Sequence, residues 1–125
     1  MIDHVVLNVK DIDKSRLFYE KALAPLGYEV VAIFPGFVGL GIGGRPDIWI
    51  ARREPFHTKV HVAISCATRS LVDEFYRVAM TTGGTDNGAP GVRAMYHPNY
   101  YGAFVYDPDG NNVEAVCHLP QGKEK

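Results

Sequence analysis

The chain repeats itself at an offset of 57 residues, and this repeat limits the possible folds more than any other feature. The residues that recur at this spacing, without a gap, are His4-Val5 with His61-Val62, Phe18-Tyr19 with Phe75-Tyr76, Ala22 with Ala79, and Gly27 with Gly84. Self-similarity at one spacing is typical of a duplicated supersecondary unit. We therefore expect a single domain over 1–125, built from two modules at about 1–55 and 58–119.

Each module begins with a short β-branched stretch, at 4–9 and at 60–66, and such a stretch indicates a strand. Apolar residues at helical spacing follow within 15–26 and 72–79, so each module is expected to place one helix on a sheet. The candidate N-caps of these helices are Asp11 or Asp13 in the first module and Thr68 or Ser70 in the second.

The remainder of each module is predicted to be strands. In the first module three apolar runs, separated by turn residues, lie near 28–34, 37–42 and 47–52. In the second, the expected elements are a short strand at 84–87, a Gly/Pro-rich loop at 88–91, and strands near 100–106 and 112–118. The segment Asp107-Pro108-Asp109-Gly110 is typical of the turn of a hairpin. The prediction is an α+β fold of two tandem β-α-β-β-β modules.

Composition argues against several classes of protein. The 13 Lys and Arg residues nearly balance the 14 Asp and Glu residues, for a net charge of −1, so nucleic acid is not an expected partner. No apolar run approaches the roughly 20 residues of a membrane helix, and we expect a cytoplasmic protein without a membrane partner. The two cysteines, Cys66 and Cys117, lack CxxC spacing and are expected to be buried thiols.

Strand alternation predicts a metal site on the face of each sheet that no helix covers. It places His4 and His61 at equivalent positions on that face, and the aligned last strands set Glu114 opposite Trp49. If the modules associate through their open faces, both histidines and Glu114 come together. Two imidazoles and a carboxylate are a ligand set for divalent Fe, Mn, Ni or Zn, with positions left for substrate.

These residues give the chain a resemblance to the vicinal oxygen chelate superfamily, which includes glyoxalase I, bleomycin-resistance proteins and extradiol dioxygenases. The motifs that carry it are His4-Val-Val-Leu-Asn-Val with Phe18-Tyr19-Glu20, His61-Val-Ala-Ile with Phe75-Tyr76, and Asp107-Pro-Asp-Gly-Asn-Asn-Val-Glu114. The resemblance implies a U-shaped mixed sheet around a divalent metal held by His4, His61 and Glu114, commonly in a homodimer. It also implies that Glu114 takes part in the chemistry as well as binding the metal.

The chain departs from this family at two positions. Glyoxalase I enzymes carry a fourth ligand where Trp49 stands, and extradiol dioxygenases generally have a tyrosine where Phe104 stands. Indole offers a metal no lone pair, so Trp49 is expected to form a cavity wall for substrate. If the last strand of the first module were shifted by one residue, Ile48 or Ile50 would point inward instead.

The second module contains a longer loop, because 53 residues separate His61 from Glu114 whereas 45 separate His4 from Trp49. An insertion beside a metal strand is a reasonable place for substrate contacts. The candidate substrate residues of this segment are Arg93, His97, Tyr100, Tyr101 and Phe104. The alternative is an ordinary polar surface loop.

Three further features have plain interpretations. His57 is expected to be solvated, and His118 to be a surface residue near the chain end, although its strand parity matches that of Glu114. The formal dinucleotide fingerprint Gly39-x-Gly41-x-x-Gly44 is rejected, because Arg45-Pro46 follows where a helix should begin.

Two functions remain open on the sequence. The first is a metal-dependent enzyme of lyase, isomerase or dioxygenase type that chelates neighbouring oxygens of a small substrate. The second is a non-catalytic protein that binds and sequesters a small molecule, as bleomycin-resistance proteins do. Bound metal would distinguish them.

Overall fold

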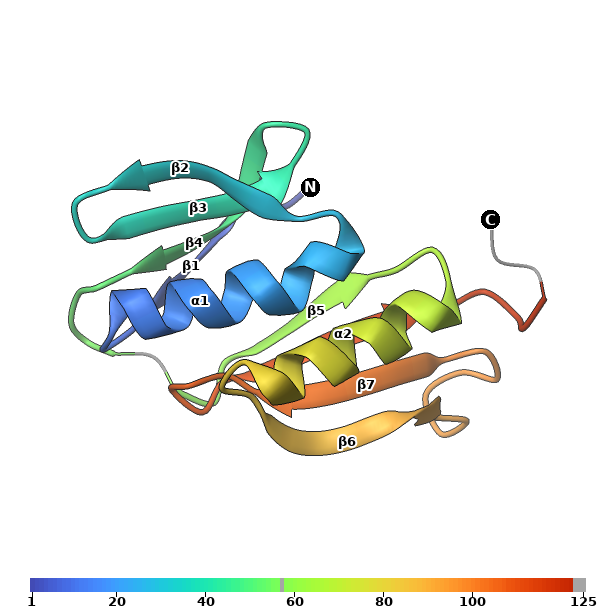
Figure 1. Ribbon diagram of the computed structural model, residues 1–125. Coiled ribbons are helices and arrows are strands. Elements are labelled where there is room, and N and C mark those ends of the chain that lie inside the picture. The colour runs from blue at the N-terminus through green and yellow to red at the C-terminus, as the bar shows by residue number, and fades with distance from the viewer. Residues whose placement is uncertain (57, 123–125) are drawn as a thin grey trace.

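Two helices lie between two four-stranded sheets in the computed structural model, which describes residues 1–56 and 58–122 (Figure 1). The elements of the first module are β1 (Val5–Asn8), α1 (Ile12–Leu23), the short 3-10 helix η1 (Ala24–Leu26), β2 (Glu29–Phe34), β3 (Phe37–Ile42) and β4 (Arg45–Ala51). Those of the second module are β5 (His61–Ser65), α2 (Arg69–Thr81), β6 (Thr85–Val92), β7 (Tyr101–Tyr106) and β8 (Asn112–Cys117). His57 lies outside the described residues.

The two sheets have the same topology. Their strand orders are β1-β4-β3-β2 and β5-β8-β7-β6. In each sheet the first strand of the module pairs parallel with the last, and the other neighbours are antiparallel. This confirms the α+β fold and the β-α-β-β-β order predicted from the repeat.

Strand register confirms the alignment of the two modules. Val6 pairs with Trp49 across β1 and β4, and Ala63 pairs with Glu114 across β5 and β8. Val6 and Ala63 are related by the 57-residue repeat, so Trp49 and Glu114 occupy equivalent places in their sheets. The register-shifted alternative for β4 is wrong.

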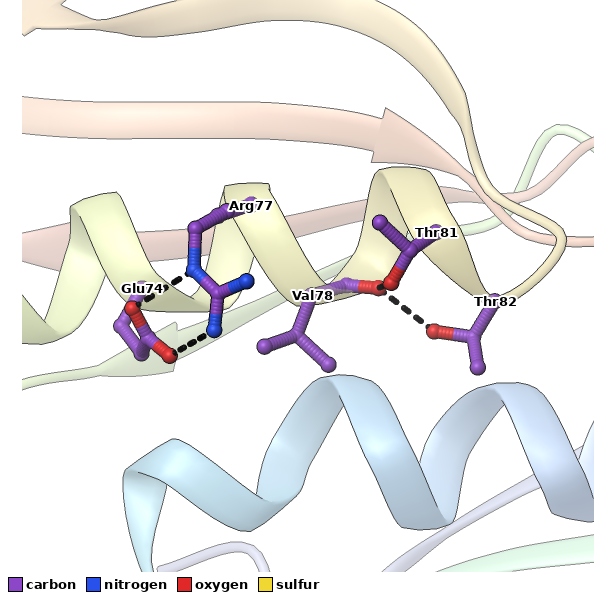
Figure 2. A network of polar contacts seen from close by, with 5 residues as sticks. All are labelled: Glu74, Arg77, Val78, Thr81 and Thr82. Atoms are coloured by element: carbon purple, nitrogen blue, oxygen red, sulfur yellow. Dashed lines mark hydrogen bonds and ion pairs between the residues drawn. The ribbon is translucent and has the colours of Figure 1, made fainter.

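Side-chain caps define the ends of the helices. The Asp11 carboxylate accepts a hydrogen bond from the backbone N–H of Lys14 at the start of α1, at 3.0 Å. Thr68 caps α2 in the same way. At the other end of α2 the hydroxyls of Thr81 and Thr82 both donate to the carbonyl of Val78, at 2.7 and 2.6 Å (Figure 2). Each side chain satisfies a backbone group that the helix itself leaves unpaired.

The core lies around the helices. Phe18 and Tyr19 of α1 and Phe75 of α2 are almost fully buried, and the two helices contact one another as well as their own sheets. Cys66 and Cys117 are buried free thiols, as expected. Burial raises the pKa of the Cys66 thiol to about 12, so it stays protonated and unreactive at neutral pH.

The turn between β7 and β8 links the second module to α1 of the first. Asp107 in this turn is buried, and its carboxylate accepts hydrogen bonds from the Tyr19 hydroxyl at 2.6 Å and from the Asn111 side-chain amide at 2.9 Å. The backbone N–H groups of Asp109 and Asn111 donate to the same carboxylate, both at 2.8 Å. Asp109 in turn accepts from the Ser15 hydroxyl at 3.3 Å. The turn motif therefore joins the modules as well as forming a hairpin.

The structure corrects the predicted loop at 88–91, which belongs to β6. Two register shifts interrupt the pairing of β6 with β7, one on each side of Gly88, and Gly88 itself has a positive φ of 147°. Such bulges let glycine-rich sequence remain in a sheet. Pro90 is tolerated because β6 is an edge strand, where one side of the ladder needs no N–H donor.

The packing of the helices decides where the open faces point. Because α1 and α2 lie in contact between the sheets, the uncovered face of each sheet is directed away from the other module (Figure 1). The sequence left open whether the modules pair through their open faces within one chain or between two chains, and within this chain the open faces do not meet. No helix in the described part of the chain is long and apolar enough to cross a membrane.

Candidate metal and substrate site

Glu114 is a buried carboxylate at the centre of the open face of the second sheet. It sits in the middle strand β8, flanked in register by Ala63 of β5 and Phe104 of β7, and its side chain is only 1% exposed. A carboxylate that has lost most of its water is costly unless it is paired with a cation, a metal or hydrogen-bond donors. The surroundings of Glu114 supply such partners.

Two side chains contact the two oxygens of Glu114. His61 Nε2 lies 2.7 Å from Oε1, and the hydroxyl of Tyr100 donates a hydrogen bond to Oε2. Burial, followed by the hydrogen bond to Glu114, raises the pKa of Tyr100 to about 12, so its phenol remains a donor at neutral pH. The side chain of His61 itself is half exposed. Together these residues satisfy both oxygens of the buried carboxylate.

His4 lies at the corresponding position of the first module. Its Nδ1 atom is 2.6 Å from the carboxylate of Asp3, so Nε2 is the atom left for another partner. A carboxylate on one ring nitrogen is a common way of orienting a metal-binding histidine. His4 also lines a cavity of about 690 Å³ together with Trp49, on the open face of the first sheet.

The predicted ligands do not all meet within one chain. Among residues 1–56 and 58–122, no three His, Cys, Asp or Glu side chains gather as a metal-binding group. His4 and His61 border one cavity of about 510 Å³ near β1 and β5, but His4 is bonded to Asp3 whereas His61 is bonded to Glu114. Among the described residues the donors in contact are therefore the pair His61 and Glu114, and His4, which borders one cavity with His61, is bonded to Asp3 instead. This pair fits a divalent ion, because an imidazole nitrogen and a carboxylate oxygen already lie side by side.

Trp49 forms part of the wall beside His4. Its indole stacks against Phe34 with ring centroids 6.2 Å apart, and both side chains line a second small cavity with His4 and Val6. A glycine on β3 makes room for the indole, since a Cβ atom at Gly39 would lie only 2.9 Å from the ring. The sequence therefore predicted the face on which Trp49 lies.

The loop candidates divide between the two faces of the second sheet. Phe104 lies on the open face with its ring 6.2 Å from that of His61, and the Arg93 guanidinium lies over Phe104 at 5.4 Å. Tyr101 points the other way, because its hydroxyl donates to Asp73 of α2 at 2.5 Å. Neighbouring residues of a strand face opposite sides. Tyr101 is thus separated from Glu114 by the sheet, and we leave it out of the site.

His118 packs beside Tyr100, although the sequence predicted only a surface residue near the chain end. Its ring packs edge-on against Tyr100 at 5.2 Å and against His97 at 6.1 Å. His97 in turn accepts a hydrogen bond from the N–H of Asn99 at Nδ1, at 3.0 Å. The sequence did indicate this position, because His118 and Glu114 are four residues apart and strand alternation directs both to the same face. These aromatic and imidazole rings form one border of the open face next to Glu114.

Comparison with known proteins identifies the family. A family model described as the Glyoxalase/Bleomycin resistance protein/Dioxygenase superfamily matches residues 1–115. The chain therefore belongs to this superfamily, as its motifs suggested. No curated protein matches it significantly.

Solved structures agree on the fold. A glyoxalase/bleomycin resistance protein from Albidiferax ferrireducens has 22% identity, covers 94% of this chain and 98% of its own, and superposes with a TM-score of 0.78. A glyoxalase/bleomycin resistance protein/dioxygenase family enzyme from Burkholderia phytofirmans has 23% identity, coverage of 94% and 98%, and a TM-score of 0.74. Glyoxalase I from Zea mays has 21% identity and a TM-score of 0.66, with 92% of this chain matching 43% of the maize chain.

Proposed function

We propose that the protein is a metal-dependent enzyme of this superfamily, acting on a small oxygenated compound by lyase, isomerase or dioxygenase chemistry. The observation that supports it best is the buried carboxylate of Glu114, placed on an open sheet face with His61 Nε2 2.7 Å away. A structural ion pair would not need to open onto a surface that no element covers. The divalent ion would be Fe, Mn, Ni or Zn, the metals suited to a mixed imidazole and carboxylate set.

His4 completes the proposed ligand set from a second copy of the chain. The open faces of one chain point apart, whereas a twofold dimer can bring the His4 face of one copy onto the Glu114 face of the other. The site would then contain His61 and Glu114 of one protomer with His4 of the partner subunit. The pairing would also cover Phe34, Trp49 and other apolar side chains that the single chain exposes in part.

The residues of the chain have separate roles in this site. A bound divalent ion would supply Lewis-acid stabilisation of negative charge on substrate oxygen atoms. Tyr100 holds the orientation of the Glu114 carboxylate by its hydrogen bond. Phe104 on one module and Trp49 on the other provide apolar walls that exclude water and support a planar part of the substrate.

Metal content tests the proposal. Protein purified without chelators and supplemented separately with Fe, Mn, Ni and Zn is expected to bind one of these ions near stoichiometrically, and Glu114→Gln is expected to lose it. Glu74→Gln is the matched control, because Glu74 is an exposed carboxylate paired only with Arg77 on the surface of α2 (Figure 2). Absence of metal from the unmodified protein under all four conditions would favour the sequestering function instead.

The fluorescence of Trp49 reports whether it shares a cavity with the metal. Trp49 is the only tryptophan, and it lines two cavities with His4. Titration with paramagnetic Cu²⁺, which quenches indole emission at short range, is expected to quench this fluorescence, and His4→Ala should remove most of the effect. Trp49→Phe should leave metal content unchanged. Full emission at saturating Cu²⁺ would show that Trp49 lies outside the metal cavity.

A further inference from the structure

We propose that Arg93 is an oxyanion subsite, so that the substrate of the proposed metal site carries a carboxylate or phosphate group at the end opposite its metal-binding oxygens. This inference rests on the proposed function for the position of the metal, but the subsite itself is built from residues of one module. The expected substrates are small anionic compounds with a flat or apolar body.

The Arg93 guanidinium lies over Phe104 on the open face of the second sheet. Its guanidinium carbon is 5.4 Å from the centre of the Phe104 ring, and one of its terminal nitrogens donates to the carbonyl of Ala89 at 2.7 Å. A guanidinium has five N–H donors, so the bond to Ala89 leaves others for an acceptor from outside. The planar fork of arginine matches the two oxygens of a carboxylate or phosphate.

Two glycines of β6 make the place that the guanidinium occupies. A Cβ atom at Gly88 would lie 3.1 Å from one terminal nitrogen of Arg93, and a Cβ atom at Gly91 would lie 3.0 Å from the other. A side chain at either position would crowd the guanidinium and shift it by a few tenths of an ångström. The glycines of the bulged strand β6 thus let the Arg93 guanidinium lie close to the backbone. This close approach is a physical reason for glycine at positions 88 and 91.

Arg93 has no acidic partner in the described part of the chain. The ion pairs there are His4 with Asp3, Arg16 with Glu20, His61 with Glu114, and Arg77 with Glu74. The one direct polar contact of the Arg93 guanidinium is the Ala89 carbonyl, which is neutral. A positioned cation without a counter-charge on an otherwise aromatic surface can pair with an anion from outside.

The ring of Phe104 connects this subsite with the proposed metal ligands. Phe104 pairs in register with Glu114, and its ring lies 6.2 Å from the His61 ring on one side and 5.4 Å from Arg93 on the other. A small molecule resting on Phe104 can therefore reach Arg93 at one end and His61 with Glu114 at the other. The charge of Arg93 would select for substrates with a negative group at the end away from the metal.

The test compares a charged probe with a neutral one of the same shape. Benzoate, phenyl phosphate and benzamide are titrated into the full chain, with binding followed by the broadening of the aromatic NMR signals of each ligand, a readout that does not depend on Arg93. Benzoate or phenyl phosphate is expected to bind at least about tenfold more tightly than benzamide, as a charge-assisted paired hydrogen bond allows. The tighter of the two anions identifies the oxyanion.

Three variants make the test specific. Arg93→Gln is expected to abolish the preference for the anions while leaving benzamide binding and metal content unchanged. Gly91→Ala keeps the charge but crowds one terminal nitrogen of Arg93, and should weaken anion binding less than Arg93→Gln does. Arg69→Gln is the matched control, because Arg69 stacks on Tyr101 at 5.1 Å on the helix-covered face of the same strand, and it should bind anions normally.

The outcomes separate this inference from the proposed function. Equal affinity for benzoate, phenyl phosphate and benzamide, or anion binding that survives in Arg93→Gln, would overturn the subsite even in a protein that binds metal. Anion binding that depends on Arg93 in a protein that takes up no metal would support the subsite and contradict the enzyme.

Discussion

Mixing equal amounts of the His4→Ala and Glu114→Gln variants is expected to restore about a quarter of the metal content of the unmodified protein. Each variant alone should bind almost none, because every site in it lacks a ligand. After joint unfolding and refolding, half of the dimers carry one chain of each kind. In such a dimer, one site receives His4 from the Glu114→Gln chain and both other ligands from the His4→Ala chain. That site has all three ligands, whereas the other site lacks both His4 and Glu114.

The physical basis of this expectation is the position of the helices. With α1 and α2 in contact between the sheets, the uncovered faces of the two sheets point away from each other (Figure 1). Mixing His61→Ala with Glu114→Gln is the control, because both lesions fall in the second module and no combination of chains repairs them. If the first mixture also fails to recover metal, the ligands do not come from two chains. Metal content of the separated dimers gives the measurement.

Asp107→Ala is expected to lower the free energy of unfolding by about 3–5 kcal/mol, the largest stability effect we predict. The substitution leaves the Tyr19 hydroxyl, the Asn111 side-chain amide and two backbone N–H groups without their acceptor in a buried place. Tyr19→Phe removes one of these donors and should cost about 1–3 kcal/mol. Urea unfolding monitored by circular dichroism provides the values.

The repeat offers a matched control for this prediction. Tyr76 is the counterpart of Tyr19, and its hydroxyl donates to Asp86 at 2.9 Å, where Asp86 also accepts from the N–H of Gly88. Asp86 is exposed, so water can replace these bonds, and Asp86→Ala should cost less than about 1 kcal/mol. Similar losses for Asp107→Ala and Asp86→Ala would show that the turn does not hold the modules together.

The same contact predicts a loss of stability at alkaline pH. Burial, and then the charge of Asp107, raise the pKa of Tyr19 well above its ordinary value near 10. The folded state keeps the phenol proton at a pH where the unfolded chain releases it. The stabilisation from this group is therefore complete below about pH 10 and declines as the pH rises above that value. Tyr19→Phe should show a shallower alkaline decline, because it has no proton to lose.

Local sequence was enough to predict most of the elements and the face of several site residues. The equivalent positions of Trp49 and Glu114 could be predicted, because strand alternation and the repeat can both be recognised along the sequence. The helix caps at Asp11 and Thr68 follow from the same kind of local chemistry. Alternation also places Tyr100 and Tyr101 on opposite faces of the sheet, although both were predicted to contact the substrate.

The strand β6 shows where local rules failed. Glycine and proline at 88–91 indicate a loop when the segment is read alone, and only pairing with β7 along one edge makes a bulged strand of it. The seat of Arg93 over Gly88 and Gly91 depends on this pairing, so its role could not be derived from spacing.

By itself, the sequence determined the two modules, their strand and helix order, and the pairing of His61 with Glu114 on one open face, because these depend on contacts within a module. The tertiary structure alone decided that, among the described residues, His4 does not gather with His61 and Glu114 into one group within the chain. The relative placement of the modules depends on α1 against α2 and on Tyr19 with Asp107, residues 88 positions apart. No periodicity encodes such a contact, because its partners are joined only by the folding of both modules.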